Sequence, residues 1–375
     1  MVSLTKLVIV RKYWQTHATD LGRKLPRYGR TRIVGQEVRP LAVKLGMAIV
    51  STNIQEYIQQ VRMLDQAGVA MIGSGDSQAL YHEQLIRTAL AAEHTVNARV
   101  GTWITNPITR HPAVTAAAIA TVDDIAPGRA FLGVGTGDST VYNANLRPAS
   151  LATLERFIYT IRELHQDGVS TWRGKECYLG WAKRRIPIGM AVSGPRAMRM
   201  AGRLADIVWV CFGIQADQIS LAKQYLEEGA REAGRRLEDI DLWWMVQLNI
   251  ADSREQALEP IKAGLATSGH ITFRYGLEGK AVPAQYQENI SELTRRYQPT
   301  RHFDNASLTD DLGLTDYLAD RLAILGTVDD CIQRIKDLEA LGANQLFFYT
   351  ALPDKERLLA HIANDVIPAV GASSG

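Results

Sequence analysis

The stretch Gly133-Val-Gly-Thr-Gly-Asp138 follows the apolar run Ala130-Phe-Leu132 in this chain of 375 residues. The apolar run predicts a buried strand, so the three glycines and the carboxylate lie in a loop at its carboxyl end. In α/β proteins that end of the strand is where ligands bind. Glycine at alternate positions lets backbone amides approach a flat ring or a phosphate, and Asp138 adds a charge at the same place.

The spacing of these glycines differs from that of a dinucleotide-binding turn. Such a turn reads Gly-x-Gly-x-x-Gly and opens directly into a helix. Here the third glycine, Gly137, comes one residue early, and residues 138–145 separate it from the next helical pattern. The loop is therefore expected to hold a ligand other than the pyrophosphate of NAD.

On both sides of this loop, short β-rich runs alternate with amphipathic helical stretches, an order typical of parallel βα units. Eight strands are expected, the number that closes a barrel. The predicted strands are 44–50, 69–72, 98–104, 129–134, 187–192, 207–212, 241–248 and 345–349. The clearest helical patterns are 54–67, 111–125, 151–165, 196–204, 218–233, 328–341 and 354–367. The predicted fold class is α/β, a (β/α)8 TIM barrel.

Length and composition allow one large domain. We expect residues 41–370 to form a single barrel domain, preceded by a basic N-terminal extension over residues 1–40. The stretch from about 264 to 326 has no clear strand and is too long for one βα connection. It is predicted to be an insertion late in the barrel that acts as a lid over the barrel mouth.

The N-terminal extension is much more basic than the rest of the chain. Residues 1–40 hold nine lysine or arginine residues against two acidic ones, although the formal net charge of the whole chain is only +2. Such a segment fits an organelle presequence, a nucleic-acid arm or, as we prefer, a solvated extension that drapes over a partner subunit. No basic groove interleaved with aromatic residues indicates nucleic-acid binding.

Other sequence features place the chain among cytoplasmic enzymes without a metal. No apolar run is long enough for a membrane span, no secretory signal is visible, and the three cysteines are widely spaced, as reduced thiols are. The histidines lack metal-ligand spacings, and no Gly-x-Ser-x-Gly elbow or P-loop lysine occurs. His111 is expected to fix its loop rather than to act as a base. We expect a cytoplasmic protein with no metal.

Polar loops follow four of the predicted strands, and their common position at one rim is more informative than any single loop. They are Gly73-Ser-Gly-Asp-Ser77, Thr105-Asn-Pro-Ile-Thr-Arg-His-Pro112, Gly135-Thr-Gly-Asp138 and Ser193-Gly-Pro-Arg196. In the last loop Ser193 is expected as the helix N-cap, with Pro195 in the first turn. Gly194 leaves the backbone amides uncovered, so this helix start can hold a phosphate. An ordinary capped helix is the alternative.

The segment Thr105–Ile125, followed by Gly133–Asp138, resembles the bacterial luciferase-like flavin-dependent oxidoreductase superfamily. The similarity is greatest to the branch of the methylenetetrahydromethanopterin reductases. Ser193–Arg196 together with Ala201–Asp206 is similar to the next block of that family. The resemblance implies a (β/α)8 barrel whose cofactor is FMN or the deazaflavin coenzyme F420.

The resemblance also implies roles for single residues. The ring of the cofactor would rest against the third strand, where a non-proline cis peptide bond is expected within Gly101–Asn106, and Asn106 would bond the ring edge. The phosphate would lie at the Ser193 loop. The implied cofactor-binding residues are Thr105, Asn106, Gly135, Thr136, Gly137, Ser193, Gly194, Pro195 and Arg196. Asp76 and Asp138 are the candidate catalytic residues, and a capping or turn-stabilising carboxylate is the alternative for Asp138.

The preferred reaction is that of a two-component monooxygenase acting on a small molecule. A separate flavin reductase would supply reduced FMN, and a dry pocket would protect the C4a-peroxide formed with oxygen. Aromatic side chains that fit either the pocket wall or the barrel core are Trp103, Trp181, Trp209, Phe212, Trp243 and Trp244. We also expect a homodimer or homotetramer.

Two alternatives remain open. Coenzyme F420 could transfer hydride to a C=N or C=O bond, with Asp138 as acid or as partner to the substrate. The Gly-Thr-Gly-Asp pattern leans toward this alternative, and FMN is preferred only because it serves a wider range of bacteria. A non-catalytic flavin-binding barrel is the third possibility, but the intact polar residues on four rim loops count against it.

Overall fold

The computed structural model describes residues 43–349 and 355–371. The N-terminal extension expected over residues 1–40 lies outside the described residues. Within them, every strand predicted for the barrel is present, with ends close to the predicted ones. These strands are β1 (Lys44–Ile49), β2 (Met71–Ser74), β3 (Arg99–Thr105), β4 (Ala130–Val134), β7 (Ile188–Val192), β8 (Ile207–Val210), β9 (Asp241–Ile250) and β11 (Gln345–Tyr349).

These strands close into a parallel barrel. They pair in the order β1, β2, β3, β4, β7, β8, β9 and β11, and β11 pairs with β1 to complete the ring. In the pair that carries the glycine loop, Val100 of β3 lies opposite Ala130 of β4, and Thr102 lies opposite Leu132. Closure leaves these strands without a free edge. The predicted (β/α)8 barrel is confirmed.

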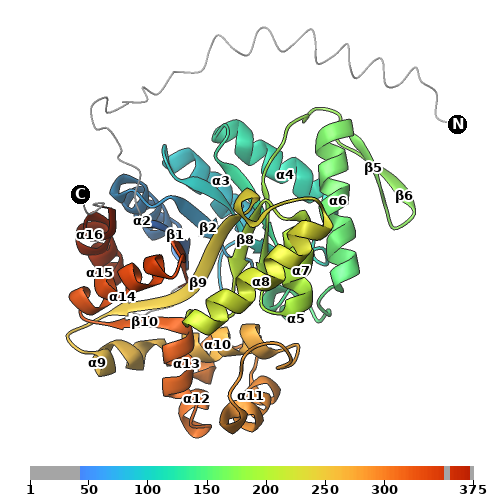
Figure 1. Ribbon diagram of the computed structural model, residues 1–375. Helices are drawn as coiled ribbons and strands as arrows, with labels where there is room; N and C mark the ends of the chain where they lie inside the picture. Colours follow the sequence, from blue (N-terminus) through green and yellow to red (C-terminus); the bar gives the residue numbers. More distant parts are fainter. Residues whose placement is uncertain (1–42, 350–354, 372–375) are drawn as a thin grey trace, which may run out of the picture. The chain divides into compact units, whose positions relative to one another are not determined.

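Helices surround the barrel, as Figure 1 shows. The helix α2 (Ile54–Ala67) begins after Asn53, whose side chain accepts hydrogen bonds from the amides of Gln55 and Glu56. It ends at Gly68, whose φ of 96° suits glycine. The other helices on the outside are α3 (Gln84–His94), α4 (Pro112–Ile125), α6 (Leu151–Asp167), α7 (Pro195–Leu204), α8 (Ala216–Glu232), α14 (Val328–Ala340), α15 (Lys355–His361) and α16 (Ile367–Gly371). Within the described residues no helix is both long and apolar enough to cross a membrane.

Side chains fill the inside of the barrel. The cluster there consists of Ala48, Met71, Trp103, Phe131, Ile207, Trp209, Cys211, Trp243, Met245 and Phe347. Trp209, Trp243 and Trp244 are at most 1% exposed, and Phe212 is fully buried. A side chain that lines a ligand pocket keeps some exposed surface when the ligand is absent. These four residues therefore belong to the core rather than to a pocket wall.

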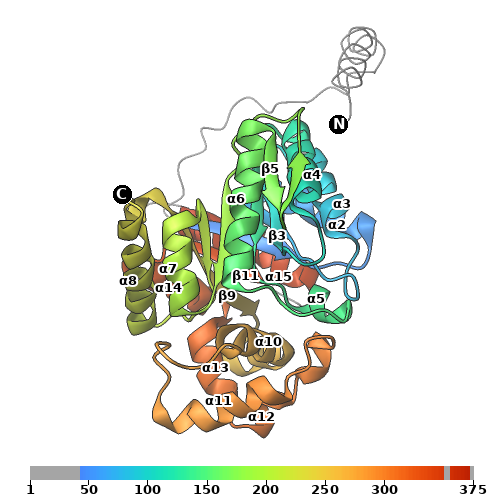
Figure 2. The same ribbon diagram turned by 90° about the vertical axis from the view of Figure 1, so that its right-hand side faces the viewer.

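Two short pieces of sheet were not predicted. The strands β5 (Val169–Trp172) and β6 (Lys175–Tyr178) form an antiparallel hairpin that follows α6 and projects beside it in Figure 2. The exposed Trp181, proposed as a pocket wall, comes just after this hairpin. The strand β10 (Ala323–Gly326) pairs with the last residues of β9. The prediction of no strand between 264 and 326 is therefore wrong. Four apolar residues between two helices are too few to show the alternating pattern by which a strand is predicted.

The insertion is helical and lies after β9. Its helices are α9 (Arg254–Leu258), α10 (Lys262–Phe273), α11 (Ala284–Arg296), α12 (Leu308–Asp311) and α13 (Thr315–Leu322). Figures 1 and 2 show α10 to α13 gathered at the barrel end toward which β9 points. One side of α10 packs on the barrel, where Ile271 contacts the inner cluster. The other side of α10 packs on α11 and α13. A role of this insertion as a lid stays a prediction.

Candidate functional site

The glycines after β4 make room for β3. A Cβ added at Gly133 would lie 2.3 Å from the carbonyl oxygen of Thr102, and one at Gly135 would lie 2.4 Å from the Cδ1 atom of Ile104. The peptide bond between Trp103 and Ile104 is cis, inside the range where a cis bond was expected. These glycines are therefore required first by the close approach of the neighbouring strand, rather than by a ligand.

Asp138 lies at the end of this glycine loop and faces the insertion. Its Oδ1 accepts a hydrogen bond from Nη1 of Arg274 at 2.7 Å, and Nε2 of His270 lies 3.6 Å away. Asp138 stands at the N-cap position of the short helix α5 (Ser139–Asn143), but its side chain makes no capping bond there. Capping is therefore excluded as the role of this carboxylate, whereas the turn-stabilising role stays open. The carboxylate instead pairs with residues far away in the sequence.

The charge state of Asp138 follows from these neighbours. Burial alone would raise the pKa of its carboxyl, but the close approach of His270 and the positive charge of Arg274 outweigh burial and hold this pKa below its ordinary value. Asp138 is thus ionised at neutral pH. An ionised carboxylate accepts hydrogen bonds and stabilises positive charge, and it has no proton to give.

His270 belongs to a buried aromatic cluster above the barrel mouth. Its ring stacks on Tyr297 with 4.2 Å between ring centroids, and the hydroxyl of Tyr297 donates to Oγ1 of Thr267 at 2.9 Å. The same hydroxyl is hydrogen-bonded to Nδ1 of His302. Burial lowers the pKa of His302, and the neighbouring His270 lowers it further, whereas Asp138 opposes both. Both ring nitrogens of His270 are buried and lack a hydrogen-bond partner among the described residues.

Asp76 is held in an ion pair. Its Oδ2 accepts from Nη1 of Arg110 at 2.7 Å and from Oγ1 of Thr105 at 3.3 Å. The side-chain oxygen of Asn106 accepts hydrogen bonds from the amides of Ile108 and Thr109, both at 3.0 Å. The side chains of Asp76, Thr105 and Asn106 thus fix the loop that follows β3. Contact of these residues with a cofactor stays a prediction.

The start of α7 departs from the prediction in one respect. The N-cap is Gly194 rather than Ser193, and no side chain bonds the first amides of the helix. The expectation that Ser193 caps this helix is wrong, because the helix starts one residue later, with Pro195 in its first turn as predicted. Arg196 is exposed. Arg199 is engaged by Glu228 at 2.7 Å, so it is not free to bind a phosphate.

Lys280 brings a positive charge to the start of α7. A Cβ added at Gly194 would lie 3.4 Å from Cε and 3.7 Å from Nζ of this lysine. Lys280 is only 2% exposed, donates to the carbonyl oxygen of Thr272 at 2.5 Å, and has no carboxylate partner among the described residues. Burial, with the charges of Arg321 and Arg274, lowers the pKa of Lys280 to about 8. The uncapped helix start and this cation together suit an anionic group.

No local pattern in the sequence indicates His270, Arg274 or Lys280 as site residues. The helix α10 is buried from Gly264 to His270, so it lacks the one-sided apolar pattern that marks a surface helix. Arg274 reaches Asp138 over 136 positions of sequence. The glycine loop and the Ser193 loop were found correctly as neighbours on one rim, but the groups that complete them come from the insertion.

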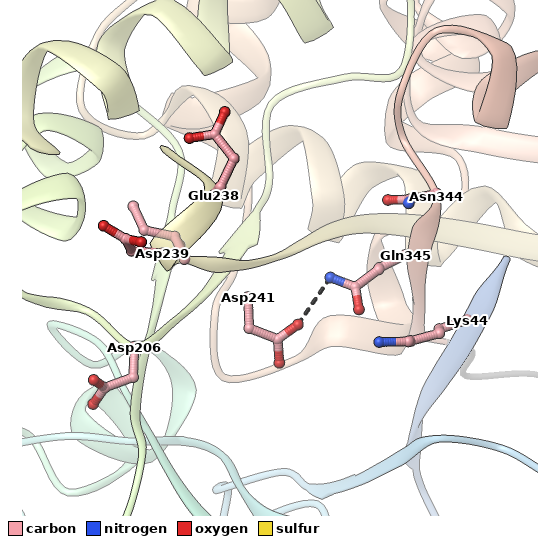
Figure 3. A pocket seen from close by; sticks show the side chains of 8 residues that line it. Lys44, Asp206, Glu238, Asp239, Asp241, Asn344 and Gln345 are labelled. Carbon is pink, nitrogen blue, oxygen red and sulfur yellow. Dashed lines mark hydrogen bonds between the residues drawn. The ribbon is translucent and has the colours of Figure 1, made fainter. Parts of the chain in front are cut away.

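The opposite end of the barrel carries a hollow of about 490 Å³ at the first residues of several strands. Figure 3 shows Lys44, Asp241 and Gln345 around it, with a hydrogen bond between Gln345 and Asp241 of 2.8 Å. Asp241 also pairs with Arg99 at 2.5 Å, and the nearby Asp206 pairs with Arg162 at 3.1 Å. In barrel enzymes this face serves stability rather than chemistry. Asp241 and Asp206 are thus already paired.

The residues at the carboxyl ends of the strands fit a phosphorylated flavin or deazaflavin. The start of α7 offers free amides and Lys280 to a phosphate, while Trp103 and His270 hold buried ring nitrogens without partners for a polar ring or substrate. Among the described residues, no group of three or more histidine, cysteine or acidic side chains could hold a metal ion. The arrangement can bind an anion at one side and orient a polar, reducible group near Asp138.

Comparison with known proteins gives a consistent result. A family model described as luciferase-like monooxygenase matches residues 40–345. The 5,10-methylenetetrahydromethanopterin reductase of Methanopyrus kandleri is 29% identical over 308 residues, which cover 74% of this chain and 84% of the relative. The F420-dependent glucose-6-phosphate dehydrogenase of Nakamurella multipartita is 28% identical over 296 residues, which cover 74% of this chain and 78% of that protein.

A solved structure supports the fold. The coenzyme F420 dependent tetrahydromethanopterin reductase from Methanopyrus kandleri aligns with a TM-score of 0.71 and 24% identity. The alignment covers 87% of this chain and 99% of that one. The barrel with its helical insertion is therefore an architecture that known oxidoreductases share.

Proposed function

This chain belongs to the luciferase-like monooxygenase family and is an enzyme, and on that premise we propose that it is a reductase dependent on coenzyme F420. Its reaction would be hydride transfer to a C=N or C=O bond of a small molecule, or the reverse. The relatives named above support this alternative better than the monooxygenase reaction that the sequence alone favoured. They also count against a non-catalytic barrel, since both are named as enzymes.

The observation that carries the proposal is the charged cluster above the barrel mouth. A flavin peroxide needs a dry, apolar pocket. Here Asp138, Arg274 and His270 lie together at that place, and most aromatic residues once considered as pocket walls are core. Hydride transfer to a polar double bond instead develops charge on nitrogen or oxygen, which such a cluster stabilises. The polarity of the site therefore favours reduction over oxygenation.

The chain's own residues would bind the coenzyme, orient the substrate and shield both from water. The bound deazaflavin supplies hydride chemistry. The start of α7 and Lys280 would hold its phosphate, and Thr136 and Gly137 would line one side of it. Arg274 fixes this loop by donating to the carbonyl oxygen of Gly137 at 3.2 Å and to Asp138. The insertion, acting as a lid, would keep water from the reacting atoms.

The test is a turnover assay with the purified full-length protein. Reduced coenzyme F420 is mixed without oxygen with methylenetetrahydromethanopterin, acetone or small aldehydes, and the absorbance of the oxidised coenzyme is followed. Oxidised coenzyme is mixed in parallel with glucose 6-phosphate and with secondary alcohols. We expect oxidation or reduction of the coenzyme with at least one of these probes. Consumption of oxygen with reduced FMN, and no reaction with coenzyme F420, would refute the proposal.

A further inference from the structure

We propose that His270 is the residue that transfers the proton during this reduction, and that Asp138 acts through His270 as its ionised partner. The inference rests on the proposed hydride transfer. It assigns a catalytic role to a side chain of the insertion, whereas the sequence pointed only to the two carboxylates. Two independent features of the structure support it.

The first feature is that His270 is buried and unsatisfied. Its side chain is 7% exposed, yet neither ring nitrogen has a hydrogen-bond partner in the described residues. A buried polar group without a partner costs about 1–3 kcal/mol, so such groups are normally bonded. Stacking on Tyr297 holds the ring in place. A substrate atom that bonds to His270 would remove the unfavourable state.

The second feature is that Asp138 is ionised and lies beside the imidazole of His270. The carboxylate is already bonded to Arg274 and lies 3.6 Å from Nε2 of His270, beyond hydrogen-bond distance but close enough for charge pairing. A carboxylate beside an imidazole orients the ring and offsets the positive charge of its protonated form. Because the pKa of Asp138 is held below its ordinary value, its own proton is absent at neutral pH. The imidazole is the neighbouring group that can carry one.

The surroundings of His270 contain one carboxylate and several groups that do not compete for its role. Arg274, just after α10, is paired with Asp138. Tyr297, which follows α11, stacks on the ring, and His302 is hydrogen-bonded to Tyr297. Burial raises the pKa of Tyr297 far above its usual range, so this hydroxyl keeps its proton. On the other side of α10, Leu293 of α11 and Leu318 of α13 contact the neighbouring Gly269 and present no charge.

Hydride from the reduced deazaflavin forms a C–H bond at the carbon of the C=N or C=O group, and the π electron pair moves to nitrogen or oxygen. Nδ1 of His270 gives its proton to that atom while Nε2 stays beside Asp138, so an N–H or O–H bond forms and the Nδ1–H bond of the ring breaks. The substrate gains two electrons and two hydrogens. The coenzyme loses one hydride and, on returning to its oxidised form, would release one ring proton to solvent. Solvent then returns a proton to the ring.

The experiment compares His270→Gln with His165→Gln. His165 is also buried, and it contacts the carbonyl oxygen of Ala116 at 3.0 Å in α4, so it controls for the loss of a buried imidazole. With methylenetetrahydromethanopterin and acetone as probes, we expect His270→Gln to lower kcat about 100-fold, since general acids contribute roughly 100- to 10,000-fold. The dissociation constant of coenzyme F420 should change less than about threefold. The fall in activity on the alkaline side of the pH profile should disappear, because it reflects loss of the proton that a general acid gives. His165→Gln should keep kcat and the pH profile.

A second measurement needs no turnover. Histidine ring signals of the full-length protein are followed by NMR between pH 5 and 9, in the wild type and in Asp138→Asn. We expect the signals of one ring, absent from the spectrum of His270→Gln or of His270→Asn, to shift in Asp138→Asn. Unchanged signals of this ring would show that Asp138 does not act through it.

The outcomes separate the two proposals. If the wild type does not react with coenzyme F420 and any probe, the proposed function fails, and the proton step fails with it. If the wild type reacts and His270→Gln keeps its kcat and pH profile, only the assignment of His270 is overturned. A loss of coenzyme binding in His270→Gln, with an unchanged pH profile, would equally overturn it in favour of a purely structural role.

Discussion

Lys280 is a buried cation that has no carboxylate partner in the part of the chain that the structure describes. Its pKa is lowered to about 8 by burial and by Arg321 and Arg274, which means that its charge is disfavoured there unless an anion arrives. A phosphate at the start of α7 would stabilise the charged form. Lys280 and Gly194 thus explain how a helix start and an insertion could share one ligand group.

From this arrangement we predict the effect of Lys280→Met on cofactor binding. The substitution should weaken coenzyme F420 about 10- to 100-fold, since hydrogen bonds to charged groups contribute about 1.5–3 kcal/mol. Binding to the wild type should also weaken as pH rises above 8, where the free lysine loses its proton, and the variant should not show this dependence. Fluorescence titration at pH 7 and 9 measures both. Equal weakening of the same deazaflavin lacking its phosphate would remove Lys280 from the phosphate site.

The ionised Asp138 also leads to a prediction about how the free energy of unfolding depends on pH. Its folded pKa lies below the unfolded value of 3.8, so the group contributes stability above that value and loses the contribution as pH falls through the folded pKa. Asp138→Asn removes the ion pair with Arg274 and should unfold more easily than the wild type at pH 7. The difference between the two should shrink as the pH is lowered below about 4. Denaturant unfolding at several pH values is the measurement, and a difference that does not change with pH would contradict the assignment.

Among the elements, the contact between β3 and β4 decides whether the glycine loop can form. A methyl group at Gly133 would meet the backbone oxygen of Thr102 at 2.3 Å, and that oxygen cannot move aside alone. Gly133→Ala should therefore lower the free energy of unfolding by about 1–3 kcal/mol or more. Gly180→Ala is the matched control, because a Cβ there has nothing within 4 Å, and it should change stability by less than about 0.5 kcal/mol. Thermal or denaturant unfolding of both variants decides the matter, and equal stability would show that β3 and β4 tolerate separation.

The elements also show how far local sequence carries. The helix α2 was predicted with its observed bounds because Asn53 caps it, Gly68 ends it, and a one-sided apolar pattern lies between them. The helix α10 was missed because it is buried on all sides, and β10 because it is only four residues long. Apolar periodicity and capping residues indicate a helix or strand that has one face in solvent. They do not indicate an element that is enclosed by other parts of the chain.

For the whole molecule, the order of strands and helices was enough to predict a closed barrel and to place its ligand loops on one rim. It was not enough to complete the site. Asp138 was identified from its loop, but Arg274, His270 and Lys280 reach that rim only after the insertion folds back across the strand ends. Such long-range contacts depend on packing that no local pattern encodes. The same contacts shift the expected chemistry from oxygenation toward hydride transfer.

The most direct test of this account is the choice of cofactor. Equilibrium dissociation constants of the purified full-length protein are measured at pH 7 for oxidised coenzyme F420 and for FMN by fluorescence titration. We predict that coenzyme F420 binds more tightly than FMN by at least about tenfold, or 1.4 kcal/mol. Tight binding of FMN, with no measurable affinity for coenzyme F420, would contradict it.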